Sequence, residues 1–290
     1  MHDFYLREYQ WFLEDPKRLE AYQHRPLPIS EWIETPYGSG LAGVIRPKIK
    51  QTLVEIFEDP DRYDEIVIVG GIGIGKSFLS GAGAAYLIHR LLCLRNPKKY
   101  FGLAGSVPIA IMNMSVNALQ AKKIVFGQVV DAVKAPWFKF QGYQPDDKIH
   151  SHLKLPKNIE VIPGNSQDTY FVGYDLFAGI LDEGAWHEVT DEKDYAEEGY
   201  NAMQRRVKSR FPNKGKLFII TSPRYVDDFV ERKFKEAETN PRIYARRIRA
   251  WESMPKDMNT SSYFYFDPDR NVIYEENEMT PYLYSKVENV

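Results

Sequence analysis

Residues 70–77 read Gly-Gly-Ile-Gly-Ile-Gly-Lys-Ser and follow an apolar stretch at 65–69. The spacing G-x-x-x-x-G-K-S matches a phosphate-binding loop, in which successive backbone N–H groups surround an anion at the start of a helix. In such a loop Lys76 reaches the β- and γ-phosphates, and the Ser77 hydroxyl binds Mg²⁺. We therefore predict an ATP site. The residues expected to line it are Gly70, Gly71, Ile72, Gly73, Ile74, Gly75, Lys76, Ser77 and Phe78.

Two adjacent carboxylates, Asp182 and Glu183, end a second apolar stretch at 176–181. In enzymes with this loop, the acid at the end of such a strand completes the Mg²⁺ shell, so Asp182 is the expected metal ligand beside Ser77. A second carboxylate next to it can polarise the attacking water as a general base, and Glu183 takes that role. A dedicated water-polarising acid favours hydrolysis over phosphate transfer to a bound acceptor.

A third apolar stretch, at 216–220, ends in the hydroxyls of Thr221 and Ser222. These hydroxyls could contact the catalytic water or Glu183 and so sense the γ-phosphate. In the alternative interpretation, Pro223 stops the strand and the hydroxyls cap the next element.

The length and composition of the chain limit the classes of protein to which it can belong. The chain has 290 residues, enough for one large domain or two modest ones. A net charge of −2 means that any contact with nucleic acid must use a local basic patch. The single cysteine, Cys93, excludes an intrachain disulfide and a thiolate metal cluster. The sequence contains neither a run of 18 apolar residues nor a secretory signal, so we expect no membrane association.

Apolar stretches and helical periodicity alternate along the chain, which predicts an α/β fold with a mainly parallel sheet. A long polar loop at 135–157 is a candidate insertion. Tyr5, Tyr9, Trp11 and Phe12 recur at roughly helical spacing, so we expect an amphipathic helix against the main body there. The expected strands are 65–69, 107–114, 158–162, 169–172, 177–181, 216–221 and 243–248, and the expected helices are 76–93, 117–133, 195–208 and 226–239.

The assembled set resembles the ATPase (motor) domain of the large terminase subunit of tailed double-stranded DNA bacteriophages. The more specific parts of the resemblance are Thr221-Ser222-Pro223, similar to the family's coupling motif, and Gln204-Arg205-Arg206-Val207-Lys208-Ser209-Arg210-Phe211. The resemblance covers roughly residues 30–275. It implies a P-loop NTPase of the additional-strand, catalytic-glutamate type with a small lid subdomain. The strand at 216–221 would then lie between the strands that carry the Walker A and Walker B motifs.

The resemblance also implies a domain plan and a function. Residues 1–60 would form a helical, adenine-side segment, 61–250 the ATPase core, and 251–290 a lid and linker. By position, Tyr37 and Arg46 would flank the adenine. The implied activity is ATP-driven translocation of double-stranded viral DNA into a procapsid, in the cytoplasm of the infected host cell. The implied partners are the portal protein and the small terminase subunit. The active form would be a homo-oligomeric ring, and the isolated chain a monomer.

The chain departs from that family in two ways. Too few residues follow Trp251 for the family's RNase H-like nuclease, so we expect the ATPase portion alone. Some relatives carry an arginine inside the phosphate loop, where this chain has isoleucine. The transition-state charge must then be neutralised from elsewhere, including a neighbouring subunit. The candidates are Arg205, Arg206, Arg210 and Arg224, of which Arg206 and Arg210 are our predicted catalytic residues.

Basic residues recur through 205–216, at Arg205, Arg206, Lys208, Arg210, Lys214 and Lys216. They either contact DNA phosphates without reading sequence or form a charged helix surface.

Three other classes of function remain open. A helicase or recombination ATPase would need a second motor core, for which the chain has no room. A small-molecule kinase usually lacks an acid equivalent to Glu183, and the same residue argues against a passive nucleotide-gated binding module. Hydrolysis stimulated by DNA would favour the motor, whereas phosphate transfer to a nucleoside would favour the kinase.

Overall fold

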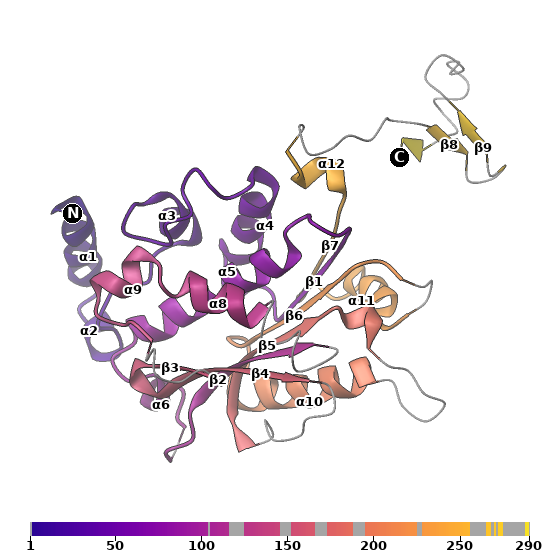
Figure 1. Cartoon of the computed structure of the whole chain (residues 1–290). Coiled ribbons are helices and arrows are strands. Elements are labelled where there is room, and N and C mark those ends of the chain that lie inside the picture. Colours follow the sequence, from indigo (N-terminus) through magenta and orange to yellow (C-terminus); the bar gives the residue numbers. More distant parts are fainter. Residues whose placement is uncertain are drawn as a thin grey trace. The chain divides into compact units, whose positions relative to one another are not determined.

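The apolar runs of the sequence become the strands of a central sheet in the computed structural model (Figure 1). The structure describes these residues: 2–103, 105–115, 125–145, 152–165, 173–187, 195–224, 228–255, 265–267, 270, 272–274 and 288–289. The strand expected at 169–172 and the helical residues expected at 117–124 lie outside these ranges.

Seven of the described strands form one sheet in the order β3-β4-β2-β5-β6-β1-β7. The pairings are parallel except that β3 runs antiparallel to β4. This arrangement confirms the predicted α/β fold, and β6 does lie between β1 and β5. The strands are β1 (Glu65–Gly70), β2 (Ile109–Ser115), β3 (Leu153–Leu155), β4 (Ile159–Asn165), β5 (Asp175–Asp182), β6 (Lys216–Thr221) and β7 (Ile243–Ile248).

Helices cover both faces of this sheet (Figure 1). Side chains alternate along β1, so Ile66 and Ile68 join one buried cluster while Val67 and Val69 join the other. The first cluster includes residues of α3, α4, α5, α8 and α9, and the second includes residues of α10 and α11. The helices are α1 (His2–Glu14), α2 (Arg18–Ala21), α3 (Ile29–Glu34), α4 (Pro47–Phe57), α5 (Lys76–Cys93), α6 (Pro97–Tyr100), α8 (Val125–Ala132), α9 (Pro136–Phe140), α10 (Tyr195–Arg210), α11 (Phe229–Ala237) and α12 (Ala250–Ser253).

One local expectation is wrong, and another is confirmed in part. The expected polar loop at 135–157 contains α9 and β3, because Trp137 and Phe138 are buried and carry that segment into the core. Helix α1 forms as expected and contacts the main body, since Phe4 packs against the core and the Trp11 ring lies 5.3 Å from that of Tyr22. Two of its aromatic side chains remain open to solvent. Tyr5 and Tyr9 are 48% and 63% exposed.

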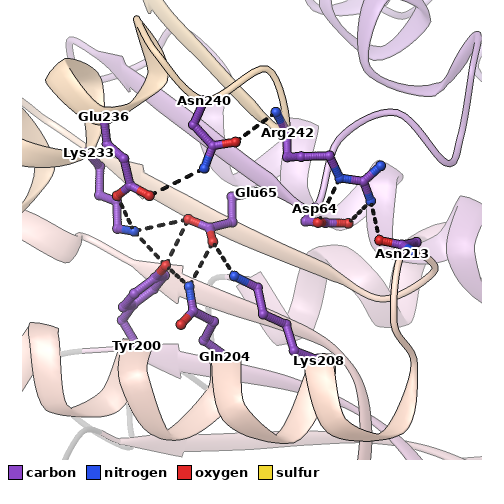
Figure 2. Close-up of polar contacts among 10 residues, drawn as sticks. All are labelled: Asp64, Glu65, Tyr200, Gln204, Lys208, Asn213, Lys233, Glu236, Asn240 and Arg242. Carbon is purple, nitrogen blue, oxygen red and sulfur yellow. Dashed lines mark hydrogen bonds and ion pairs between the residues drawn. The ribbon is translucent and has the colours of Figure 1, made fainter.

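An ionic cluster closes the amino end of β1 (Figure 2). The buried Glu65 carboxylate accepts hydrogen bonds from the Tyr200 hydroxyl at 2.8 Å, from Gln204 Nε2 at 2.8 Å and from Lys233 Nζ at 3.1 Å. Lys233 also contacts Glu236 at 2.8 Å. Because these partners come from α10 and α11, the cluster ties both helices of one face to the strand that leads into the phosphate loop.

The chain divides into two compact units, Met1–Ser253 and Met254–Val290. In the second unit, β8 (Tyr265–Asp267) pairs antiparallel with β9 (Val272–Tyr274) and with β10 (Glu288–Asn289). Its role as a lid stays a prediction. Across the described ranges, no helix combines the length and the apolar character that a bilayer span would require.

Candidate functional site

The turn from β1 into α5 has a backbone that requires glycine at several positions. Gly73 and Gly75 have φ angles of +84° and +101°, which L side chains rarely adopt. A Cβ on Gly70 would lie 2.2 Å from Cδ1 of Ile74 and 2.5 Å from the carbonyl oxygen of Ile248. The loop therefore turns tightly and presents its backbone at the start of an 18-residue helix.

The two isoleucines of the loop lie in different environments. Ile74 is buried in the core, whereas Ile72 is 87% exposed at the tip of the loop. Arg46, at the N-cap of α4, donates a hydrogen bond from Nη1 to the carbonyl oxygen of Gly73 at 2.5 Å. This contact places Arg46 beside the loop, and its role on the adenine side stays a prediction.

Tyr37 packs among aromatic rings of the N-terminal and α9 segments. Its ring centroid lies 6.3 Å from that of Phe4 and 6.0 Å from that of Phe140. Its contact with adenine stays a prediction.

Lys76 is buried, and its ammonium group lies among oxygen atoms. Nζ donates to the carbonyl oxygens of Gly70 and Gly71 at 2.8 and 3.1 Å, and to Ser222 Oγ at 3.0 Å. Burial lowers the pKa of Lys76, and the nearby charges of Glu183 and Asp182 oppose that shift. The structure therefore brings the lysine of the loop and the two acids of β5 into one electrostatic environment.

Asp182, the last residue of β5, is 1% exposed. Burial and the adjacent charge of Glu183 raise its pKa to about 6, against hydrogen bonding from Ser115 and the charge of Lys76. Ser115 Oγ donates to Asp182 Oδ2 at 3.1 Å from the end of the neighbouring strand β2. Sequence reasoning missed this serine, because the polar residues that end β2 carry no motif and gain meaning only once β2 is known to lie beside β5.

Glu183 sits in the left-handed region of the backbone map, with φ +51°, where β5 turns into a 3₁₀ helix at Gly184–Trp186. Its carboxylate accepts a hydrogen bond from the backbone N–H of Ser222 at 3.0 Å. The Thr221 and Ser222 hydroxyls lie 3.4 and 3.5 Å from it. Thr221 Oγ1 also accepts a hydrogen bond from the backbone N–H of Ala185 at 3.1 Å. A non-glycine residue in this conformation stores strain, which is common where a side chain has a functional role.

The order of the strands explains why these groups meet. Parallel strands present their carboxyl ends at the same edge of the sheet, and β5, β6 and β1 are consecutive neighbours. Residues that directly follow these strands therefore converge, with Ser222 between Lys76 and Glu183. Such an arrangement can hold a phosphate chain near Lys76 and present a carboxylate to its terminal group.

Arg206 and Arg210 lie toward the opposite edge of the sheet. Arg210 Nε is 3.5 Å from Asp175 Oδ1, at the amino end of β5. That end is about 23 Å from Asp182, at about 3.3 Å per residue. Helix α10 runs back along the sheet, so its last turns, which hold both arginines, point away from the loop. This corrects any expectation that Arg206 or Arg210 acts on the phosphate of its own chain, and a role toward a neighbouring subunit stays a prediction.

Three residues of the basic stretch at 205–216 pair with acids, including Arg210 with Asp175. Lys208 pairs with Glu65, and Lys214 pairs with Asp61. Lys216 has no exposed surface, so it cannot contribute to a surface patch for DNA.

Comparison with protein-family models identifies the chain as a P-loop domain. Residues 21–275 match the family described as "Uncharacterized protein MJ0330, N-terminal P-loop domain", and the chain belongs to that family. A search of curated proteins finds no match.

Comparison with solved structures confirms the fold resemblance to phage large terminases. The HK97 bacteriophage large terminase is 19% identical, with a TM-score of 0.54, and the match covers 82% of this chain and 46% of that one. The large terminase of a thermophilic bacteriophage, in complex with ATP-γ-S, is 12% identical, with a TM-score of 0.51 and coverage of 73% and 47%. The chain thus matches about half the length of these terminases.

Proposed function

We propose that this chain is an ATPase that binds ATP with Mg²⁺ and hydrolyses it. The observation that carries the proposal is the position of Ser222, which contacts the ammonium group of Lys76 and the carboxylate of Glu183 at the same time. Ser222 thereby links the lysine that would bind phosphate to the carboxylate that would activate water. The terminase of the thermophilic phage, whose fold is similar, binds the ATP analogue ATP-γ-S, and this supports ATP as the ligand.

The site is chemically suited to Mg²⁺. Mg²⁺ prefers oxygen ligands and usually keeps several waters, with one or two protein side chains and the phosphate oxygens of the substrate. Ser77 at the start of α5 and Asp182 at the end of β5 would be these side chains. When bound, Mg²⁺ would offset the negative charge of the phosphates.

Each catalytic residue then has a distinct role. Lys76 compensates the charge of the β- and γ-phosphates. Glu183 orients the attacking water and accepts its proton. Thr221 and Ser222 hold Glu183 by hydrogen bonds, so a change at the γ-phosphate can reach the end of β6 through Ser222.

We further propose that hydrolysis drives the packaging of double-stranded viral DNA into a procapsid. The support is the fold shared with two phage large terminases, together with the coupling motif at Thr221-Ser222-Pro223. In this proposal the chain works in the cytoplasm of the infected cell as a homo-oligomeric ring on a portal protein, with the small terminase subunit as a partner.

The test measures phosphate release from ATP with Mg²⁺, with and without double-stranded DNA, and uses Lys76→Ala as the negative control. Hydrolysis that rises with DNA is the expected result. Transfer of the γ-phosphate to a nucleoside without release to water would favour a kinase. DNA-independent hydrolysis would leave the ATPase assignment intact but contradict the motor.

A further inference from the structure

Two carbonyl oxygens of the phosphate loop accept hydrogen bonds from side chains that are distant in the sequence. Gly73 accepts from Arg46 Nη1 at 2.5 Å, and Ile74 accepts from the Ser253 hydroxyl at 2.6 Å. Ser253 is the last residue of the short helix α12 and is 5% exposed, so its hydrogen bond to Ile74 is shielded from water. Removal of a buried donor leaves its acceptor unsatisfied, which costs more than the loss of an exposed hydrogen bond.

The direction of each of these carbonyls fixes the direction of the N–H group that follows it. A trans peptide is planar, and its C=O and N–H point to opposite sides. Across the described residues, the structure contains no cis peptide bond. The N–H of Gly75 therefore points away from Ser253, and the N–H of Ile74 points away from Arg46. Because successive N–H groups of such a loop surround the anion, the two side chains orient groups that would contact phosphate.

Helices α4 and α12 support the loop together. A Cβ on Gly75 would lie 3.3 Å from Cδ1 of Ile49, a residue of α4, so this helix packs directly against the loop. The Nζ of Lys48, also on α4, is 3.2 Å from Glu252 Oε1 on α12. This ion pair ties α12 to α4 and holds the Ser253 hydroxyl in place.

We propose that Ser253 is a positioning residue of the ATP site, because its hold on the carbonyl of Ile74 orients the N–H of Gly75 for phosphate. This inference rests on the proposed ATPase function. Ser253 is uncharged and acts through the loop, so its effect belongs to the binding of the phosphate chain. The N–H groups of the loop contact phosphate both before and during the reaction, so the loss of Ser253 should weaken binding and leave the chemical step nearly unchanged.

The experiment compares the parent chain with Ser253→Ala, Ser253→Thr and a matched control, Ser209→Ala. Ser209 Oγ also donates to a backbone carbonyl, that of Arg206 at 3.1 Å, but on the exposed surface of α10. Displacement of a fluorescent ADP analogue gives the Kd values for ADP and for inorganic pyrophosphate. We expect Ser253→Ala to raise both Kd values about tenfold. Ser253→Thr keeps the hydroxyl and should stay within about threefold of the parent, and Ser209→Ala should match the parent.

Steady-state hydrolysis gives a second readout. In Ser253→Ala, KM for ATP should rise about tenfold while kcat stays within about threefold of the parent, because an interaction made equally in the ground and transition states changes KM alone. A purely structural contact would lower the melting temperature but leave the nucleotide affinity of the folded molecules unchanged. Thermal unfolding measures that stability separately.

A further variant, Ser253→Cys, tests the inference even if Ser253→Ala does not fold. The thiol is close to the hydroxyl in size but is a weaker donor, so the fold is kept while the hydrogen bond to Ile74 weakens. We expect Ser253→Cys, under reducing conditions, to raise the Kd values for ADP and pyrophosphate about fivefold.

Three results would overturn the inference while leaving the ATPase intact. One is parent-like Kd values for ADP and pyrophosphate in Ser253→Ala, or in Ser253→Cys if the alanine variant does not fold. Another is weaker binding of ADP with unchanged binding of pyrophosphate, because that would assign the effect to the base or the ribose. The third is a fall in kcat at unchanged KM. A parent chain that neither binds nor hydrolyses ATP would overturn the proposed function and this inference together.

Discussion

The two ends of the central sheet handle buried charge in opposite ways. At the amino end of β1, Glu65 is surrounded by Lys233, Tyr200 and Gln204, each of which donates a hydrogen bond to it (Figure 2). At the carboxyl ends of β5 and β1, the adjacent acids Asp182 and Glu183 share the neighbourhood of one buried lysine, Lys76.

The pKa directions express this difference. Burial would raise the pKa of Glu65, but the charge of Lys233 and the hydrogen bonds of Tyr200 and Gln204 outweigh it, so the pKa falls. Burial and Glu183 instead raise the pKa of Asp182 to about 6. Both acids are almost completely buried. The donors around Glu65 compensate its charge at one end of the sheet, whereas Asp182 and Glu183 leave excess negative charge at the other end, where a cation can be held. The predictions below test that contrast.

The largest expected effect is that of Lys76→Ala. This variant leaves the phosphate charge uncompensated, so kcat/KM for ATP should fall at least about 1,000-fold. Steady-state hydrolysis and a fluorescent-nucleotide titration would measure it, with Lys50→Ala on α4 as an exposed-lysine control. If Lys76→Ala kept full ATP affinity and turnover, the result would contradict the phosphate-binding role of the loop.

Glu183→Gln should separate binding from chemistry. The amide keeps the size of the side chain but cannot accept a proton from water, so turnover should fall at least about 100-fold while ATP still binds. Single-turnover hydrolysis with bound ATP would measure the chemical step directly. Parent-like hydrolysis would show that Glu183 is not the base.

Glu65→Gln should affect stability rather than chemistry. It leaves Lys233 without its buried counter-charge, although Glu236 remains, and should cost about 2 kcal/mol of unfolding free energy at pH 7. The pKa of Glu65 is lowered by folding, so its contribution is present above the unfolded pKa and is lost as pH falls. Denaturant unfolding at pH 7 and pH 4 would show a smaller cost at pH 4. An equal cost at pH 7 and pH 4 would show that the charge of Glu65 does not contribute to stability.

Asp182→Asn should have the smallest effect on the free energy of unfolding, and it should stabilise the fold, whereas Glu65→Gln destabilises it. The pKa of Asp182 is raised in the folded chain, so ionisation destabilises the fold as pH rises through about 6. Without metal or nucleotide, the variant should be more stable than the parent by roughly 1 kcal/mol at pH 8, and the gain should vanish near pH 4. Thermal unfolding in a chelating buffer at both values measures this. A variant less stable than the parent at pH 8 would show that the negative charge of Asp182 does not destabilise the folded chain.

Much of the fold was predictable because β1, β5 and β6 are continuous apolar runs, and the loop at 70–77 has a fixed spacing. These local signals predicted that Lys76 begins a helix and that Asp182 ends a strand, as the structure shows. The pairing of Ser115 with Asp182 was not predictable, since it depends on which strands are neighbours. The Glu65 cluster was missed for the same reason, because its partners are more than 130 residues away. The position of Arg210 beside Asp175, at the amino end of β5, was not predictable either, because sequence alone does not show that α10 runs back along the sheet.

The strand β6, inserted between β1 and β5, acts as a spacer. Neighbouring strands lie about 4.8 Å apart, so the strands that carry the lysine and the acids are separated by about 10 Å. If they were direct neighbours, Lys76 and Glu183 could close into a salt bridge and cancel each other. The intervening strand instead places Ser222 between them, with its hydroxyl 3.0 Å from Lys76 Nζ and 3.5 Å from Glu183 Oε1.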